Sequence, residues 1–261
     1  MKVVILAGGF GTRLSEYTKL IPKPMVEIGG KPILWHIMKH YSTYGYKDFI
    51  IALGYKGDVI KNYFLQYYTL SNDFTIDLNG NHISYIKERP LDWKVSLVDT
   101  GERSMTGGRI LRLKDLIGNE NFMLTYGDAV SNVNIRELVD RYHQSGKLAM
   151  VTAVHPTARF GELSIDENNI AHSFKEKPQV NQGWINGGYF VLSPRIFNYI
   201  QDDSTVFEGE PLKSVAREGE LAVYKHEGFW QCMDTVRDRD YLNHLWDEGH
   251  TPWTQPYSSE K

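Results

Sequence analysis

Hydrophobic residues in the first half of the chain follow two alternating patterns. Short apolar runs rich in β-branched residues predict buried strands, as at 3–7 and 49–53. Between and after these runs, apolar residues recur at helical spacing, which predicts helices at 32–44 and 58–68. Such an alternation of strand and helix favours a parallel sheet covered by helices.

Beyond residue 70 the pattern predicts shorter strands separated by turns. Strands at 74–78 and 82–87 flank Asn79-Gly80-Asn81, a sequence typical of a β-turn. The tail at 251–261 is polar and is expected to pack loosely. Further strands are expected at 93–99, 122–126, 148–154, 162–166, 170–175, 188–192 and 221–226, and further helices at 134–145 and 236–248.

One more helix is expected at 108–117. Its inward residues would be Ile110, Leu111, Leu113 and Leu116. The chain contains no low-complexity linker and no internal repeat, so a single domain at 1–261 is expected. The predicted fold class is α/β: a Rossmann-like, mixed but mostly parallel sheet flanked by helices, with small antiparallel extensions.

Composition narrows the choice of partners and compartment. The formal net charge of -3 over 261 residues argues against a general nucleic-acid-binding surface. Cys232 is the only cysteine, which excludes an intramolecular disulfide and is typical of a reducing compartment. No apolar run reaches the length of a membrane span. We therefore expect a cytoplasmic protein without nucleic-acid or membrane partners.

The strongest chemical signal is a glycine-rich segment directly after the first strand, with the sequence Leu6-Ala7-Gly8-Gly9-Phe10-Gly11-Thr12-Arg13. Ligands of parallel sheets bind beyond the carboxyl ends of the strands, where glycines let backbone N–H groups approach phosphate oxygens. Thr12 adds a hydroxyl donor, and Arg13 can bind two phosphate oxygens at once. A tight connection between a strand and a helix would also use glycines without binding a ligand, so the loop alone does not show that phosphate binds here.

A second candidate is Lys23, which lies between Pro22 and Pro24. Each proline fixes its own φ and restricts the residue before it, so Lys23 is held on a stiff segment. The alternative is a solvated loop lysine. The nearby glycine-rich loop favours a contact with phosphate instead.

Three segments in this order and spacing, at 8–14, 22–25 and 30–33, resemble the nucleotidyltransferase family that makes nucleotide sugars. Two positions depart from the family pattern: Phe10 stands where leucine is usual and Ala129 where glycine is expected. Within the family, the resemblance is greatest to cytidylyltransferases that use glucose 1-phosphate. It is carried by the segments at 24–38, 99–101, 104–109 and 125–128.

The resemblance implies a reaction and a metal. CTP and glucose 1-phosphate would be the substrates, and CDP-glucose and pyrophosphate the products. Asp128 and Asp234 correspond to the aspartates that hold Mg²⁺ in the family. From the residues alone, Asp128 would be a turn residue after a strand and Asp234 a helix N-cap. Arg13, Lys23 and Asp128 are expected to take part in catalysis.

The remaining binding residues are also implied by the resemblance. The nucleotide would be bound by Leu6, Ala7, Gly8, Gly9, Phe10, Gly11, Thr12, Arg13, Lys23, Ser104, Arg109 and Gly127, and the sugar phosphate by Gly161, Glu176, Lys177, Asn186 and Gly187. Arg109 could meet either the cytosine carbonyl or a phosphate, and the sequence leaves this open. The nucleotide-binding half would be about 1–130, and the sugar-phosphate-binding half about 131–250. A symmetric homo-oligomer, a trimer or a hexamer, is expected.

Three alternatives remain. The same chemistry could use UTP, dTTP or another sugar. The fold could instead serve as a non-catalytic regulatory subunit, although such a module need not keep the full set of charged residues. A glycosyltransferase with a related sheet fits the glycine-rich loop and Lys23 segment poorly.

His36 and His40 have metal-binding spacing but lack a glutamate companion, so they are expected to pack or face solvent.

Overall fold

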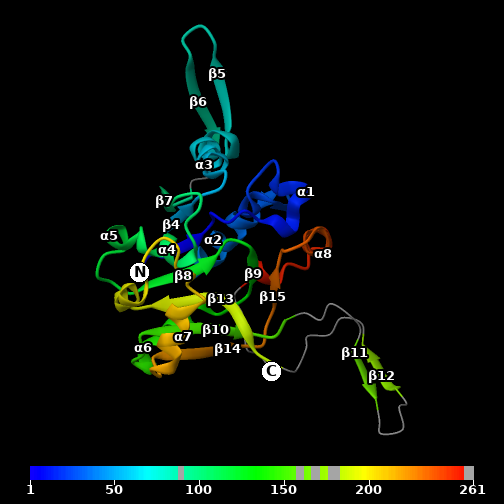
Figure 1. Cartoon of the computed structure of the whole chain (residues 1–261). Coiled ribbons are helices and arrows are strands. Elements are labelled where there is room, and N and C mark those ends of the chain that lie inside the picture. The colour runs from blue at the N-terminus through cyan, green and yellow to red at the C-terminus, as the bar shows by residue number, and fades with distance from the viewer. Residues whose placement is uncertain (88–90, 157–161, 166–170, 176–182, 256–261) are drawn as a thin grey trace.

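A seven-stranded sheet forms the centre of the molecule (Figure 1). The computed structural model describes residues 1–87, 91–156, 162–165, 171–175 and 183–255. The strand order across the sheet is β14 (Leu221–His226), β10 (Ala149–Val154), β13 (Ile185–Leu192), β8 (Phe122–Tyr126), β1 (Val3–Leu6), β4 (Asp48–Leu53) and β7 (Lys94–Asp99).

All but one of these strands run in the same direction. β1 pairs in parallel with β4 and β8, β4 with β7, and β10 with β14. β13 lies antiparallel between β8 and β10. The prediction of a mixed, mostly parallel Rossmann-like sheet is therefore confirmed, and most predicted strands lie within a residue or two of their expected bounds.

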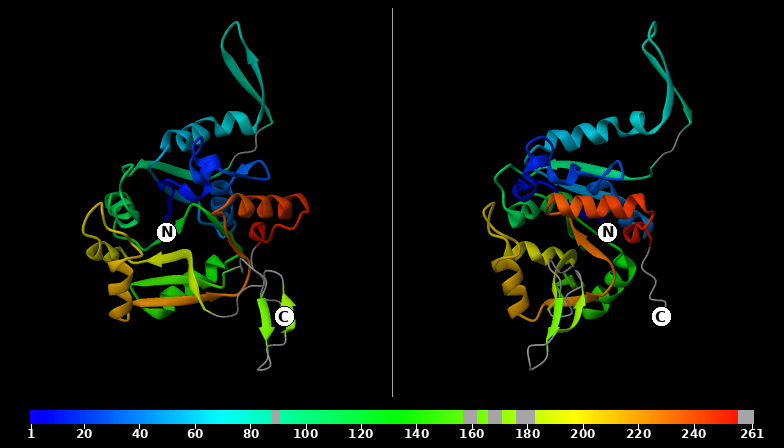
Figure 2. Two further views of the ribbon diagram at one scale, coloured as in Figure 1. Left: turned by 45° about the vertical axis from the view of Figure 1, so that its right-hand side comes forward. Right: turned by 90° about the vertical axis from the view of Figure 1, so that its right-hand side faces the viewer.

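Helices cover both faces of the sheet (Figure 2). Side chains of a strand alternate between its two faces, so Val3 and Ile5 join one core cluster while Val4 and Leu6 join the other. The first cluster includes residues of α2 (Ile33–Thr43), α3 (Gly57–Ser71), α6 (Ile135–Ser145) and α8 (Val236–Asp247). The second includes residues of α4 (Thr106–Leu111), α5 (Lys114–Ile117) and α7 (Glu210–Arg217).

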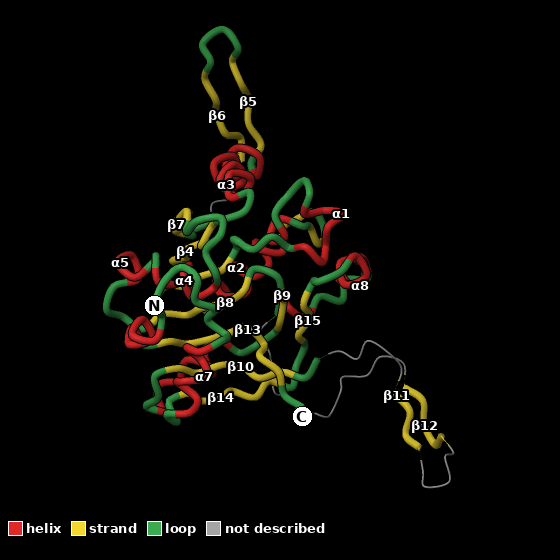
Figure 3. The backbone as a smooth tube through the Cα atoms, viewed as in Figure 1, coloured by secondary structure: helices red, strands yellow, loops and turns green. Residues whose placement is uncertain are grey.

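Within the described ranges, four small two-stranded sheets accompany the central one: β2 (Glu27–Ile28) with β3 (Lys31–Pro32), β5 (Asp73–Asp77) with β6 (His82–Lys87), β9 (Ala129–Ser131) with β15 (Trp230–Cys232), and β11 (Glu162–Ile165) with β12 (Ala171–Lys175). The β5–β6 hairpin follows α3 and projects away from the body of the molecule (Figures 1 and 3). A short helix, α1 (Ser15–Thr18), lies between the glycine-rich loop and the Lys23 segment. The helices of the described ranges are all too short or too polar to cross a lipid bilayer.

The prediction of a single helix at 108–117 is wrong, because the structure has two helices, α4 and α5, in its place. Regular helical geometry is interrupted at Leu113, which has φ -95° and ψ 0°. The interruption turns the second segment, so Ile117 is buried and Leu116, expected to face inward, is 41% exposed. α7 had no predicted counterpart.

The expectation of a loosely packed tail is wrong for the residues that the structure describes, 251–255. Trp253 is only 1% exposed and is among the largest fully buried side chains. Its indole Nε1 donates a hydrogen bond to His36 Nδ1 at 3.3 Å, and its ring lies 5.6 Å from that of Phe229. A single large aromatic side chain therefore anchors this segment to the core beside α2.

We predict that Ile117→Ala lowers the free energy of unfolding by about 2–5 kcal/mol, because it leaves a cavity in the second core cluster. Leu116→Ala is the matched control, and it should cost less than about 1 kcal/mol because the side chain is already half in water. Urea unfolding followed by circular dichroism measures both values. Equal losses for the two variants would contradict the arrangement of α5.

Candidate active site

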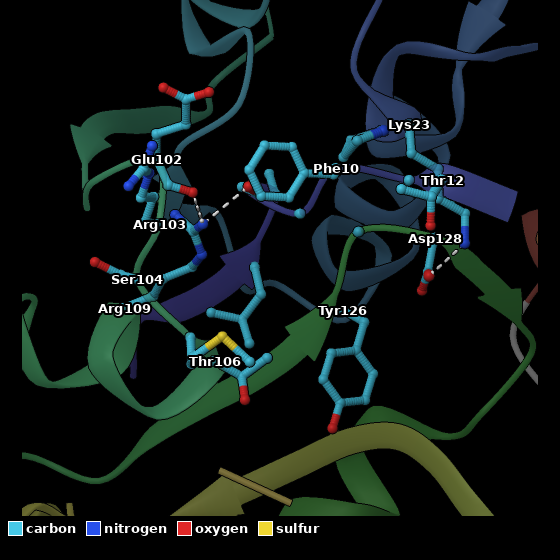
Figure 4. A pocket seen from close by; sticks show the side chains of 18 of the residues that line it. Phe10, Thr12, Lys23, Glu102, Arg103, Ser104, Thr106, Arg109, Tyr126 and Asp128 are labelled. Atoms are coloured by element: carbon cyan, nitrogen blue, oxygen red, sulfur yellow. Dashed lines mark hydrogen bonds and ion pairs between the residues drawn. The ribbon is translucent and has the colours of Figure 1, made fainter. Parts of the chain in front are cut away.

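A pocket of about 390 Å³ opens at the carboxyl ends of β1 and β8 (Figure 4). The two strands pair in parallel, with Leu6 opposite Tyr126, so the glycine-rich loop and Gly127-Asp128 leave the sheet side by side. The backbone N–H of Gly127 donates to the carbonyl of Leu6 at 3.0 Å and fixes this neighbourhood. The segment that follows β7 forms the opposite wall, with Glu102, Arg103, Ser104, Met105 and Thr106.

Lys23 joins two carboxylates at one end of this pocket. Its ammonium group donates to Asp128 Oδ2 at 2.7 Å and to Asp234 Oδ1 at 2.6 Å. The guanidinium of Arg13 donates to the other oxygen of Asp234, Oδ2, at 2.5 Å. The structure thus brings together four of the predicted residues, from positions as far apart as 13 and 234.

The pairing of two short strands places Asp234 beside Asp128. β9 directly follows Asp128 and β15 lies just before Asp234, and the two strands are antiparallel with Cys232 opposite Ala129. The N–H of Met233 donates to the carbonyl of Asp128 at 2.8 Å. The N-cap of α8 is Thr235, so the alternative that Asp234 is the N-cap is wrong.

Burial and charge act in opposite directions on this cluster. Burial favours the neutral amine of Lys23, but the Asp128 and Asp234 carboxylates outweigh it and raise the pKa of Lys23 above its usual range. Burial likewise works to raise the pKa of Asp234, yet Lys23 and Arg13 hold it below the usual value. Lys23 and Asp234 are therefore both held in their charged forms by their neighbours.

Packing fixes the stem of Lys23. Gly11 has φ +61°, and a Cβ at that position would lie 3.0 Å from the Cβ of Lys23 and 2.8 Å from the Cγ2 of Thr18. The side chain of Lys23 is only 10% exposed. The loop and the lysine segment are therefore packed closely against one another, with no room for a side chain at Gly11.

Arg109 has a different environment from the one the sequence suggests. It is 4% exposed, and its guanidinium donates to the carbonyls of Leu53, Gly101, Gly8 and Glu102 and to Thr100 Oγ1, at 2.7–3.1 Å. These partners follow or end β1, β4 and β7. Arg109 thus ties three neighbouring strand ends together at the pocket (Figure 4).

A further hydrogen-bond network joins Tyr126 and Thr106, two residues that line the pocket. The hydroxyl of Tyr126 donates to Glu208 Oε1 at 2.5 Å, and Thr106 Oγ1 donates to Glu208 Oε2 at 2.6 Å. Asn186 Nδ2 donates to the Tyr126 hydroxyl at 3.3 Å. The network connects the nucleotide side of the pocket to β13, the strand that begins just before the predicted sugar-binding residues Asn186 and Gly187.

Comparison with known proteins agrees with this geometry. The family model described as "Nucleotidyl transferase" matches residues 2–243. The chain belongs to the nucleotidyl transferase family. Glucose-1-phosphate cytidylyltransferases of Salmonella typhi and Salmonella typhimurium are each 51% identical to it over 254 residues, which are 97% of this chain and 98% of theirs. The crystal structure of HddC from Yersinia pseudotuberculosis matches with a TM-score of 0.69 and 26% identity, covering 94% of this chain and 99% of that one.

Nucleotidyltransferases generally use a divalent metal ion, and the residues of this one fit such a group. Ligand atoms of Asp128, Cys232 and Asp234 all lie within 4.8 Å of one another, and all three residues are partly exposed. Burial and the Asp128 carboxylate raise the pKa of the Cys232 thiol, which keeps it protonated. The two carboxylates would therefore be the groups that hold the ion, a hard oxygen pair of the kind that suits magnesium or manganese.

All twelve residues predicted to bind the nucleotide line the pocket of the nucleotidyltransferase. Asn186 and Gly187 are not among its lining residues: Asn186 contacts the lining residue Tyr126, and the carbonyl of Gly187 accepts from the indole of Trp230 at 2.8 Å. Three predicted sugar-phosphate residues, Gly161, Glu176 and Lys177, lie outside the described residues. His36 and His40, the histidines set aside as a metal pair, are buried.

Sequence reasoning missed Glu102, Arg103 and Glu208. The first two follow the predicted strand at 93–99, so the rule that ligands bind beyond strand ends could have found them. Glu208 lies before α7, in a segment without a predicted element, and no local pattern indicates it.

We predict that Gly8→Ala destabilises the protein by about 1–3 kcal/mol, because the new Cβ would lie 2.2 Å from Arg109 Nη1. Gly9→Ala is the control, since a Cβ there meets no atom within 4 Å, and it should change the free energy of unfolding by less than about 1 kcal/mol. Urea titration without substrates separates this packing effect from phosphate binding. If Gly9→Ala proved the more harmful variant, the role given to Arg109 would be wrong.

Proposed function

We propose that this nucleotidyltransferase transfers a cytidylyl group from CTP to α-D-glucose 1-phosphate, giving CDP-glucose and pyrophosphate. The choice of substrates rests on the similarity to the two Salmonella cytidylyltransferases, which are 51% identical to this chain over 97% of its length. The pocket supports the reaction type, because a glycine-rich loop, two cationic side chains and two carboxylates meet at one sheet edge.

The reaction needs positioning more than a nucleophilic side chain. A sugar phosphate has a second pKa near ~6, so it is mostly a dianion at neutral pH. One of its oxygens forms a bond to the α-phosphorus of CTP while the bond from that phosphorus to the bridging oxygen of the pyrophosphate breaks. The C1–O bond of the sugar stays intact. The chain therefore has to bring two anions together and stabilise the charge that develops.

Cationic groups of the chain supply that stabilisation. Arg13 and the N–H groups of the glycine-rich loop hold the departing pyrophosphate. Lys23 contacts the α-phosphate and the attacking oxygen, since it lines the same pocket as the loop. Asp128 and Asp234 would hold Mg²⁺, which would neutralise phosphate charge when bound.

The second half of the chain binds the sugar. Asn186 offers a donor and an acceptor for sugar hydroxyls, and its side chain already reaches toward the pocket through Tyr126. Gly187 lies next to it, and Gly161, Glu176 and Lys177 complete the proposed sugar-phosphate site. This arrangement divides one domain into a nucleotide-binding half at about 1–130 and a sugar-binding half at about 131–250. The single cysteine supports a cytoplasmic location.

The test is pyrophosphate release with glucose 1-phosphate and CTP, UTP, dTTP, ATP or GTP in turn. We expect kcat/KM with CTP to exceed that with any other triphosphate by at least about a hundredfold. Equal or higher turnover with UTP or dTTP would refute the CTP assignment and keep the reaction type. Absence of turnover with every triphosphate would favour the non-catalytic alternative.

The same assay tests the metal ligand. Asp128→Ala should lower kcat by at least about a hundredfold, because one of two proposed ligands is lost. Asp115→Ala on the exposed surface of α5 should retain normal turnover. Unchanged turnover in Asp128→Ala would remove that residue from the mechanism.

The proposal includes a homo-oligomer, a trimer or hexamer, and the β5–β6 hairpin supports it. Phe74 pairs with Tyr85 and Ile76 with Ile83, so one face of the ribbon is apolar. Phe74, Ile76 and Ile83 are 37–43% exposed, and Leu78 at the tip is 83% exposed. An isolated two-stranded ribbon is marginally stable in water, and apolar patches of this kind mark interfaces.

Ile76→Lys should therefore shift the sedimentation velocity of the protein toward that of a monomer, because it places a charge on the apolar face of the ribbon. Thr75→Lys, on the opposite face of the same strand, should leave the assembly unchanged. An oligomer that withstands Ile76→Lys would show that the hairpin does not form its interface.

A further inference from the structure

The contacts of Lys23 and Arg13 leave little of the carboxylate pair free for another cation. Asp128 Oδ2 and Asp234 Oδ1 accept from the Lys23 ammonium, and Asp234 Oδ2 accepts from Arg13. Three of the four carboxylate oxygens are thus bonded to a positive side chain. A divalent ion that used one oxygen of each aspartate would have to share an oxygen of Asp234 with Lys23 or Arg13, and it would lie next to the Asp128 oxygen that accepts from Lys23.

Charge makes joint occupancy unfavourable. The two aspartates and the two cationic side chains sum to zero, so a divalent ion added to this arrangement would lie beside two positive groups with no compensating anion. Arg13 can withdraw easily, because its side chain is 72% exposed. The Lys23 ammonium is largely buried and must find another anionic partner inside the pocket.

We infer that Lys23 and the divalent ion compete for Asp128 and Asp234, and that the phosphates of the nucleotide relieve this competition by accepting the lysine ammonium. The inference rests on the proposed function, which makes the two aspartates the metal ligands. Lys23 is then the residue that couples metal binding to nucleotide binding. Each ligand strengthens the binding of the other by the same factor, as linkage requires.

The fixed stem of Lys23 makes the exchange a local movement. Pro22, Pro24 and the close approach to Gly11 hold the backbone, so only the methylene chain can reorient. The glycine-rich loop lines the same pocket as Lys23 and Asp128. The ammonium can therefore pass from the carboxylates to a phosphate bound at the loop without a movement of the main chain.

The test measures binding of Mn²⁺ alone, without nucleotide, from the electron paramagnetic resonance signal of the free ion. Mn²⁺ prefers oxygen ligands, so it avoids the ambiguity that a softer ion would meet at the nearby Cys232 sulfur. We expect Lys23→Gln to bind Mn²⁺ at least about tenfold more tightly than the unmodified protein, because the competing charge is gone. Lys23→Arg keeps the charge and should bind it as weakly as the unmodified protein.

Further variants separate this inference from the metal assignment. Asp128→Asn and Asp234→Asn, each combined with Lys23→Gln, should abolish the gain; if the gain persists in both, the ion binds elsewhere and the proposed metal site fails. Lys47→Gln removes another lysine–aspartate pair, with Asp92, and should leave Mn²⁺ affinity unchanged. Equal or weaker Mn²⁺ binding by Lys23→Gln would overturn the competition while leaving the proposed reaction intact.

A second measurement covers the folding of the variants. Mn²⁺ should raise the melting temperature of Lys23→Gln more than that of the unmodified protein, since a ligand stabilises the folded state according to its affinity. Lys23→Met offers the same loss of charge if the glutamine variant does not fold. A smaller rise in both variants would contradict the inference.

Discussion

The attraction between one buried ammonium group and two carboxylates connects the distant parts of this molecule. Lys23 comes from a stiff segment near the N-terminus, Asp128 from the end of β8, and Asp234 from the connection between β15 and α8. Without a cation between them, the two carboxylates would repel each other at this distance. The C-terminal segment and the glycine-rich loop therefore meet around a charge-balanced centre, and the pocket owes its shape to that balance.

The same centre suits the chemistry of nucleotidyl transfer, in which both reactants are anionic. A site made only of positive groups would bind phosphate strongly, but it would be costly to fold because like charges repel. In this molecule Lys23 and Arg13 are instead each paired with an aspartate. The folded protein thus stabilises these cationic side chains close to the position where the phosphate oxygens of the substrates would bind.

The sequence predicted the parts of the site that depend on strand ends. β1 and β8 are short, largely apolar runs, so the sequence alone places the glycine-rich loop and Asp128 at one edge of the sheet. Asp234 could be assigned only through family resemblance. The strands that position it, β9 and β15, have three residues each, too few to show a periodic pattern. The environment of Arg109 was also beyond prediction, because four of its five partners are backbone carbonyls, which any residue type supplies.

The position of Arg109 affects how related proteins with this pocket could evolve to bind a different nucleotide. Because one side chain bonds the backbone after three adjacent strands, those loops form a single rigid rim whose order is established when the protein folds. A nucleotide entering the pocket meets walls that are already in place, so it loses little affinity to loop ordering. Diversification toward another base would then proceed by exchanging the side chains carried on this rim, such as those of Glu102 and Arg103, while its main-chain path is retained.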